Sequence, residues 1–403
     1  MIKIVIAGEV DSGKSTLIGR LLFDTDSITL GAKEEFKKTC RDLGRPLEFA
    51  YLLDSFQEER QDEFTLDTTQ ALLKTAGREF LLIDVPGHRQ LLENMLTGTS
   101  YADTAALVID LNKSLEEQTK RHLYILKFLG IDTVIIVINK IDTVRYNQDV
   151  FSKVESQIKG FLKSWDIRAD YIIPVSAKEG LNLIHKPEQL KWYSGPSFIE
   201  ALNTLVKKEK DFDFRFPIQD IYKVKNETVA VGMLASGNVQ TGDFLRILPS
   251  GAEVKLKAIK VFNRIKRVAR CGESVGLVLN PPEAQIKRGQ VVYSGKPPYL
   301  AAKIQAKIFC LSALNLDEVL SIACAAQEVL GKISRIKESM DTASWQKNQD
   351  SSVLEALDAA QVTIDLREPL VIERFPDLPE LGRLVLKKDE KICALGIIEE
   401  ILN

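Results

Sequence analysis

Glycines, hydroxyl residues and one lysine are grouped near the start of the chain in the order Gly8-Glu9-Val10-Asp11-Ser12-Gly13-Lys14-Ser15-Thr16. Glycines at this spacing let the backbone curl until successive N–H groups converge on one anion. The lysine can reach phosphate oxygens, and the hydroxyl that follows it can bind Mg²⁺. The sequence therefore predicts a site for a nucleoside triphosphate, with a metal contact from Ser15 and ligand contacts from Gly8, Asp11, Ser12, Gly13, Lys14, Ser15 and Thr16.

The flanking residues supply the elements that such a loop needs. Residues Ile2–Ala7 form an apolar run typical of a buried strand, and Thr16–Leu22 has the spacing of an amphipathic helix. A strand, a G-x-x-x-x-G-K-S loop and a helix together are the context of a phosphate-binding loop. The alternative, a chance glycine-rich turn, is disfavoured by the Lys-Ser pair and by both flanking elements.

A second motif, Asp84-Val85-Pro86-Gly87-His88, ends another apolar run. We expect Asp84 to hold Mg²⁺, through water, and the Gly87 N–H to meet the γ-phosphate. A lone histidine is more often a surface or core residue than a catalyst. The position of His88 directly after Gly87 reverses that expectation, because there it can orient the attacking water.

Two further motifs predict guanine as the base. Asp142, in Asn139-Lys140-Ile141-Asp142, can accept the N1–H and the exocyclic N2–H₂ of guanine, a pattern that adenine lacks. We expect Asn139 to tie this loop to the phosphate loop and the Lys140 stem to cover the base. In Ser176-Ala177-Lys178 the Ala177 N–H can read guanine O6. GTP with Mg²⁺ is the predicted ligand.

A threonine that closes over Mg²⁺ and the γ-phosphate is the remaining part of such a site. Thr65 is the candidate, with Thr68 and Thr69 as competitors and an ordinary strand threonine as the alternative for all three. The expected reaction is in-line attack by water, with His88, Lys14 and Thr65 as the catalytic residues. The sequence identifies no arginine finger, so we expect slow hydrolysis that a partner accelerates.

The order of elements predicts three domains. Residues 1–208 alternate apolar strands with helical patterns, which predicts an α/β domain with a doubly wound, mostly parallel sheet. Short strands separated by turn residues predict a β-barrel over 209–296 and a second one over 297–403. In the last domain we expect an exposed loop at Met340–Ser352 and a short helix at Leu354–Ala360.

Composition narrows the partners and the compartment. The net charge is −2 and the densest basic stretch, Lys255–Arg270, fits the solvated face of barrel strands, so we do not expect nucleic acid as a partner. The sequence contains no run of about 18 apolar residues, so we expect no membrane-spanning helix. The first expected strand starts at Ile2, which leaves no room for a secretory signal, so we expect none. The five scattered cysteines favour reduced, buried thiols and a cytoplasmic location.

Taken together, the motifs resemble those of the translation-factor class of GTPases, whose layout is a GTP-binding domain followed by two β-barrels. The insert before Thr65 is similar both to elongation factor 1-alpha and to the GTP-binding large subunit of sulfate adenylyltransferase. Three segments look more like the sulfate-activating subunit: Gly19–Asp24, Glu117–His122 and Trp192–Pro196.

The resemblance implies a GTPase that pairs with a separate catalytic subunit, which makes adenylyl sulfate and pyrophosphate from ATP and sulfate. Two other interpretations stay open. The first is an elongation factor that binds aminoacyl-tRNA, for which Lys255–Arg270 is the best support. The second is a divergent GTP switch, because Glu63 stands where the family usually has glycine and so restricts the loop that carries Thr65.

Overall fold

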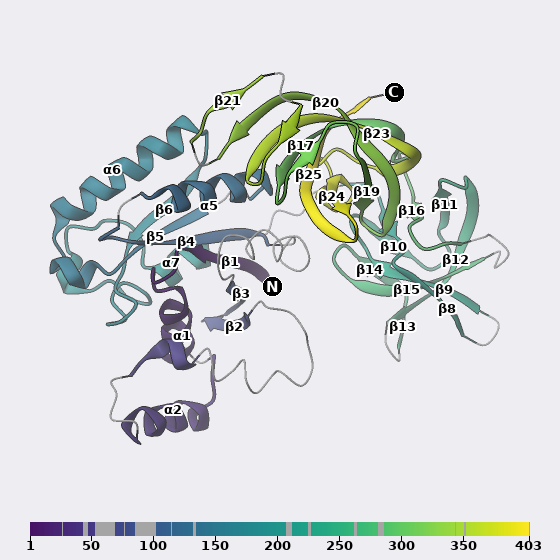
Figure 1. The fold of residues 1–403 in the computed structure, drawn as a ribbon. Helices are drawn as coiled ribbons and strands as arrows, with labels where there is room; N and C mark the ends of the chain where they lie inside the picture. Colours follow the sequence, from purple (N-terminus) through teal and green to yellow (C-terminus); the bar gives the residue numbers. More distant parts are fainter. Residues whose placement is uncertain are drawn as a thin grey trace. The chain divides into compact units, whose positions relative to one another are not determined.

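The structure is a computed structural model in which the chain divides into two compact units, Met1–Lys208 and Glu209–Asn403 (Figure 1). Each unit is described by itself. The structure describes residues 1–25, 27–42, 47–52, 69–75, 77–84, 102–113, 115–131, 134–206, 212–224, 227–261, 264–280, 286–342, 344–349 and 352–402.

The first unit is built on a six-stranded sheet with the order β2-β3-β1-β4-β5-β6. All neighbouring strands are parallel except the β2–β3 pair at one edge. The central strands are buried along their whole length because helices cover both faces, so their sequences are continuously apolar. This confirms the predicted doubly wound sheet. The strands are β1 (Ile2–Gly8), β2 (Thr69–Thr75), β3 (Arg78–Asp84), β4 (Thr104–Asp110), β5 (Val134–Asn139) and β6 (Ala169–Pro174).

Helices α1 and α7 pack on one face of this sheet, against alternate side chains such as Ile4 and Ile6. Helices α5 and α6 cover the other face (Figure 1). Local signals set several helix starts: Asn147 caps α6, and Ser197 forms a capping box with Glu200 at α7. The elements are α1 (Lys14–Asp24), α2 (Leu30–Asp42), α5 (Glu117–Phe128), α6 (Gln148–Ser164), α7 (Phe198–Thr204) and the 3₁₀ turns Ile141–Val144 and Glu188–Leu190.

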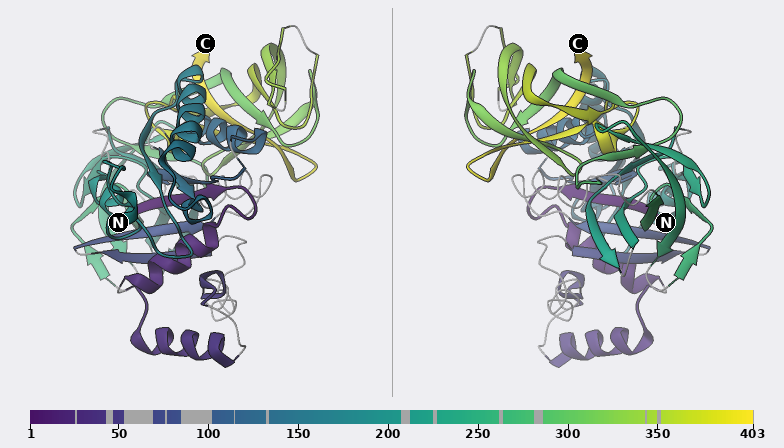
Figure 2. Two further views of the ribbon diagram at one scale, coloured as in Figure 1. Left: turned by 90° about the vertical axis from the view of Figure 1, so that its left-hand side faces the viewer. Right: turned by 90° about the vertical axis from the view of Figure 1, so that its right-hand side faces the viewer.

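Helix α2 lies away from the central sheet (Figures 1 and 2). It buries Phe36 and Cys40 in a small cluster with Phe49, and Phe23 of α1 packs against that cluster. The helix was not predicted, because its apolar residues are few and its surface is mostly charged.

The second unit begins with a sheet of the order β7-β16-β11-β12-β15-β9-β8, in which β13 pairs with β12 and β10 with β14 separately. This is the first predicted barrel. Its strands are β7 (Arg215–Pro217), β8 (Asp220–Val224), β9 (Glu227–Met233), β10 (Asn238–Gln240), β11 (Phe244–Leu248), β12 (Ala252–Val261), β13 (Arg264–Lys266), β14 (Val268–Arg270), β15 (Ser274–Asn280) and β16 (Val291–Tyr293).

The second barrel has the order β19-β24-β25-β17-β23-β20-β21, and pairing of β19 with β20 closes it. Its other strands, β18 and β22, pair with each other. Among the described residues of this barrel, the helix is α8 (Pro379–Gly382). The strands are β17 (Tyr299–Cys310), β18 (Leu314–Asn315), β19 (Val319–Cys324), β20 (Gln327–Asp341), β21 (Lys347–Asn348), β22 (Val353–Leu354), β23 (Asp358–Ile372), β24 (Arg383–Lys388) and β25 (Lys391–Leu402).

Two predictions for this barrel differ from the structure, the first only in part. The expected exposed loop at Met340–Ser352 is exposed at Ser344 and over residues 346–349, but it starts inside β20, where Met340 is buried and pairs with Lys347 of β21. The expected helix at Leu354–Ala360 is replaced by β22, a turn and the start of β23. Leu354 pairs with Leu314 in the core, and such tertiary contacts override the helix preference of a short alanine-containing segment.

A buried ion pair joins the two barrels. Arg215 Nε and Nη2 each lie 2.9 Å from Glu373 Oε1, and both side chains are almost fully buried. A small apolar cluster lies at the same junction, with Ala235 and Val291 from the first barrel and Val371, Leu378 and Leu381 from the second.

Four of the five cysteines are buried, as predicted, namely Cys40, Cys310, Cys324 and Cys393. Cys271 differs because it is exposed in the turn that follows β14. Within the described residues, no helix is long and apolar enough to span a membrane.

Candidate nucleotide-binding site

The loop between β1 and α1 has the backbone that its glycines predict. Gly8 has φ 151° and Gly13 has φ 90°, both in the region that favours glycine. A Cβ atom on Gly8 would lie 2.3 Å from the Val108 carbonyl oxygen, and one on Gly13 would lie 2.3 Å from Asn139 Nδ2. Both positions thus require glycine. The loop ends at the N-terminus of α1, which favours an anion and has no acidic residue in its first turn to oppose one.

The Lys14 ammonium folds back over this loop. Its Nζ donates to the Gly8 carbonyl at 2.8 Å and to the Glu9 carbonyl at 2.7 Å. Burial lowers the pKa of Lys14, although the carboxylates of Asp84, Asp11 and Glu9 oppose that shift. The protein's own carbonyls thus hold the Lys14 ammonium at the loop.

Ser15 and Asp84, which we predict as metal ligands, lie next to each other. The Ser15 hydroxyl lies 3.4 Å from Asp84 Oδ2 at the carboxyl end of β3. A hydroxyl and a carboxylate beside a phosphate site are the hard oxygen donors that Mg²⁺ prefers. The residues present therefore fit the ion.

Asn139 ties the two ends of the site together, as predicted. Its Nδ2 donates to the Ser12 carbonyl at 2.8 Å, and its Oδ1 accepts the Ala177 N–H at 2.9 Å. Both bonds are buried. The second bond also bears on the Ala177 prediction, because this N–H is already engaged within the protein, and a contact with guanine O6 has to share or displace that bond.

Lys140 and Asp142 follow at the end of β5. Lys140 has φ 68°, and its Nζ lies 2.7 Å from Asp110 Oδ2 at the end of β4. Burial alone would raise the pKa of Asp110, but the bonds from Lys140 and Asn112 outweigh it and hold that pKa below its usual value. Asp142 is half-buried in the 3₁₀ turn, and its carboxylate accepts no hydrogen bond from another described residue, which leaves it available to a ligand.

The Ser176–Lys178 segment lies directly after β6. Ser176 is fully buried, and its hydroxyl accepts the Glu179 N–H at 3.2 Å. The Lys178 side chain is exposed, whereas its carbonyl accepts Arg20 Nη1 of α1 at 3.2 Å. This contact links the segment to the helix that carries the phosphate loop.

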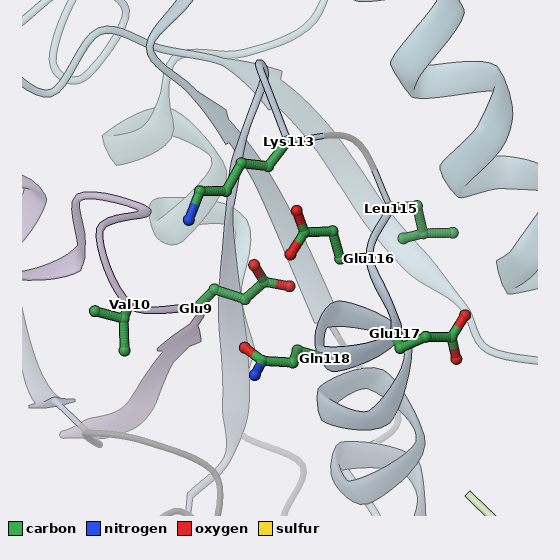
Figure 3. A pocket seen from close by; sticks show the side chains of 7 residues that line it. All are labelled: Glu9, Val10, Lys113, Leu115, Glu116, Glu117 and Gln118. Carbon is green, nitrogen blue, oxygen red and sulfur yellow. The ribbon is translucent and has the colours of Figure 1, made fainter. Parts of the chain in front are cut away.

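Beside the phosphate loop is a pocket that the sequence analysis missed (Figure 3). Glu9 and Val10 line one side of it, and residues at the start of α5 line the other. The Glu9 carboxylate is buried and accepts both the N–H and the hydroxyl of Thr119, at 3.1 and 2.7 Å. A hydrogen bond to Glu9 raises the pKa of Glu116. The loop is thereby fastened to α5.

Three predicted residues, Thr65, Gly87 and His88, lie outside the described residues, as do Thr68 and Glu63. Thr69 is the first residue of strand β2, which favours the alternative that Thr69 is an ordinary strand threonine. Asp11 is exposed and Thr16 half-buried at the loop. Their roles and that of His88 stay predictions.

An α/β domain with a phosphate loop of this geometry, followed by two β-barrels, is the layout of P-loop GTPases of the translation-factor class. The family model described as the elongation factor Tu GTP binding domain matches residues 1–211, and one described as GTP-eEF1A C-terminal domain-like matches residues 303–399. This chain belongs to the elongation factor Tu family of GTP-binding, GTP-hydrolysing proteins.

Relatives match the chain over almost its whole length. Elongation factor 1-alpha of Aeropyrum pernix is 34% identical over 99% of this chain and 96% of its own. Elongation factor 1-alpha of Methanoculleus marisnigri is 33% identical over the same shares. A solved structure of Sup35 complexed with GDP covers 100% of this chain and 94% of its own, at 22% identity and a TM-score of 0.47. The protein is thus a GTPase of the elongation-factor type, and neither named relative carries a sulfate adenylyltransferase name.

Proposed function

We propose that this chain binds GTP with Mg²⁺ between the phosphate loop and the segments Asn139–Asp142 and Ser176–Lys178, and that its GTP form binds aminoacyl-tRNA. The buried Asn139 amide carries the first part of the proposal. It fixes the loop suited to phosphates and the segment suited to guanine in one arrangement, through Ser12 and Ala177.

At the phosphate end, two N–H groups of the Lys14 ammonium hold the Gly8 and Glu9 carbonyls, and the third is left for a phosphate oxygen. Ser15 and Asp84 would hold Mg²⁺, which when bound neutralises charge on the β- and γ-phosphates. At the other end, the Asp142 carboxylate accepts the two guanine N–H groups while Lys140 stays paired with Asp110.

A nucleotide competition experiment tests this part. The protein should bind GTP and GDP and should not bind ATP at the same concentration. Asp142→Asn should lose the preference for guanine, because an amide cannot accept two N–H groups as a carboxylate does. A variant that still prefers GTP to ATP would contradict the role of Asp142.

The aminoacyl-tRNA proposal is supported by the end-to-end similarity to proteins named elongation factor 1-alpha. The test is retention of aminoacyl-tRNA by the protein loaded with a non-hydrolysable GTP analogue, against the GDP form. We expect binding in the first form only, weakened by salt because contacted phosphates release counterions. Equal retention of deacylated tRNA, or none in either form, would contradict the proposal.

A second candidate is the GTPase subunit of a sulfate adenylyltransferase, with an adenylyl-transferring partner subunit. One observation favours it over RNA binding: carboxylates neutralise much of the basic stretch on the first barrel. Lys257 and Lys260 both pair with Glu227, and Lys266 pairs with Glu273. Co-purification of a stoichiometric adenylyl-transferring subunit with the tagged protein would favour the sulfate adenylyltransferase candidate over the aminoacyl-tRNA proposal.

A further inference from the structure

Tyr146 connects three parts of the protein around the guanine-side segments. Its hydroxyl donates to the Glu179 carboxylate, its N–H donates to the Ile141 carbonyl at 3.0 Å, and its own carbonyl accepts Trp192 Nε1 at 3.0 Å. Ile141 belongs to the motif that contains Asp142, whereas Glu179 follows Ser176–Lys178 directly. One tyrosine therefore spans the two segments from outside.

The backbone around Tyr146 is strained. Arg145 and Tyr146 are consecutive non-glycine residues with φ of 51° and 60°, and Lys140 nearby has φ 68°. Such conformations persist only where the surroundings fix them, and they gather at sites of function. The ring of Trp192 packs on Phe151 with centroids 5.2 Å apart, so the residue that holds the Tyr146 carbonyl is itself held.

Glu179 is held on its own side. Its N–H donates to the Ser176 hydroxyl, so the backbone of Glu179 is fixed to the Ser176–Lys178 segment. The hydrogen bond to Glu179, with burial and the nearby Asp142, raises the pKa of Tyr146 to about 12. A phenol at its ordinary pKa of 10 already keeps its proton at neutral pH, so the raised pKa extends its ability to donate to more alkaline pH.

We propose that Tyr146 and Glu179 form a latch that positions Asp142 against Ser176–Lys178, and so sets how long guanine nucleotide stays bound and how well the exocyclic amine of guanine is read. Both are positioning residues, since their contact is with each other. The proposal rests on the proposed binding of GTP at this site.

The competing explanation is that the pair only stabilises the fold. The two explanations differ in selectivity. A loosened latch lets Asp142 move relative to the base, which weakens reading of N2–H₂ and narrows the difference between guanine and hypoxanthine nucleotides. Loss of fold stability alone leaves that difference unchanged.

The experiment measures dissociation of GDP and of inosine diphosphate from the full chain carrying Tyr146→Phe. We expect GDP to leave about three- to ten-fold faster, as for the loss of one ordinary, solvent-exposed hydrogen bond, and the ratio of the IDP to the GDP dissociation rate to fall. Tyr193→Phe is the matched control, since it removes a phenol of the same domain that bonds neither segment. Unchanged GDP dissociation in Tyr146→Phe, or the same acceleration in Tyr193→Phe, would overturn the proposal.

A double-mutant cycle separates the latch from independent effects. Glu179→Ala should accelerate dissociation as Tyr146→Phe does, and the combined variant should be no faster than either one. Glu179→Gln, which keeps an acceptor oxygen, should lie between Glu179→Ala and the unchanged protein. Additive effects would overturn the latch. If the unchanged protein binds neither nucleotide, the proposed function fails instead, and the two failures are distinguishable.

Discussion

In each unit of the protein a buried polar side chain joins distant segments, and the side chains of Asn139 and Arg215 differ in kind. In the first unit the neutral amide of Asn139 joins Ser12 and Ala177. In the second unit the charged guanidinium of Arg215 joins the barrels through Glu373. Both side chains are almost completely buried.

The difference lies in what each group needs around it. The amide needs one donor and one acceptor, and the two backbone groups supply them at no cost in buried charge. The ion pair has to offset the desolvation of two charges, and Arg215 accordingly donates also to the carbonyls of Phe214, Ser294 and Lys296. Burial raises the pKa of Glu373 even though Arg215 opposes that shift. The neutral amide of Asn139, which we call the neutral junction, thus suits a site that exchanges ligands. The Arg215–Glu373 pair, which we call the charged junction, suits a fixed contact.

The largest expected effect is on the charged junction. Arg215→Met leaves Glu373 buried without its partner, which should lower the free energy of unfolding of the second unit by about 3–5 kcal/mol. Urea denaturation of the full chain measures it. The double variant Arg215→Met, Glu373→Leu should recover most of the loss, and a double variant as unstable as the single one would break the comparison.

Asn139→Ala tests the neutral junction. Two buried backbone groups lose their partner, so we expect a loss of about 2 kcal/mol in unfolding free energy and GDP binding weakened by at least about tenfold, as for a displaced binding group. Calorimetric titration with GDP measures the second effect. Asn203→Ala is the control, because the Asn203 side chain bonds Thr75 at the exposed surface. Equal effects of the two changes would show that burial of the amide is unimportant.

Lys14 gives a smaller effect with a definite sign in pH. Its pKa in the folded protein lies below 10.5, so in the window between the two values the unfolded chain binds more protons and stability rises with pH. Lys14→Met should abolish that rise. The measurement is the melting temperature of both proteins from about pH 8 to pH 11, spanning the ordinary lysine pKa. Parallel profiles of melting temperature against pH for the two proteins would contradict a lowered pKa of Lys14.

The smallest effect belongs to exposed ion pairs. Lys260 and Lys257 lower the pKa of Glu227 to about 2, so its contribution is present above the ordinary pKa of 4.5 and is lost as pH falls toward 2. Because the group is exposed, we expect Glu227→Gln to cost less than either junction and its effect to vanish in about 1 M salt. Urea denaturation at pH 7 in low and high salt measures it, and a salt-independent loss would contradict a screened pair.

The sequence was sufficient for the parts of the site that lie next to one another along the chain. Continuous apolar runs identified the parallel strands, and motifs at their ends located Lys14, Asp84 and Asn139. Contacts between distant residues were not predictable in this way. Glu9 and Thr119 are 110 residues apart, and Tyr146 and Glu179 are 33 apart, so neither pair has a local pattern. The helix expected at Leu354–Ala360 failed for the same reason, because its neighbours in space decide its structure.

The fold-back of Lys14 limits how freely its long side chain can move. Hydrogen bonds to two loop carbonyls use two of the three N–H groups of its ammonium. The third N–H remains for a phosphate oxygen, so Lys14 can contact phosphate while both carbonyl bonds stay in place. The loop itself thus orders this side chain, and the entropy that Lys14 loses on nucleotide binding should be smaller than for a lysine that extends freely into solvent.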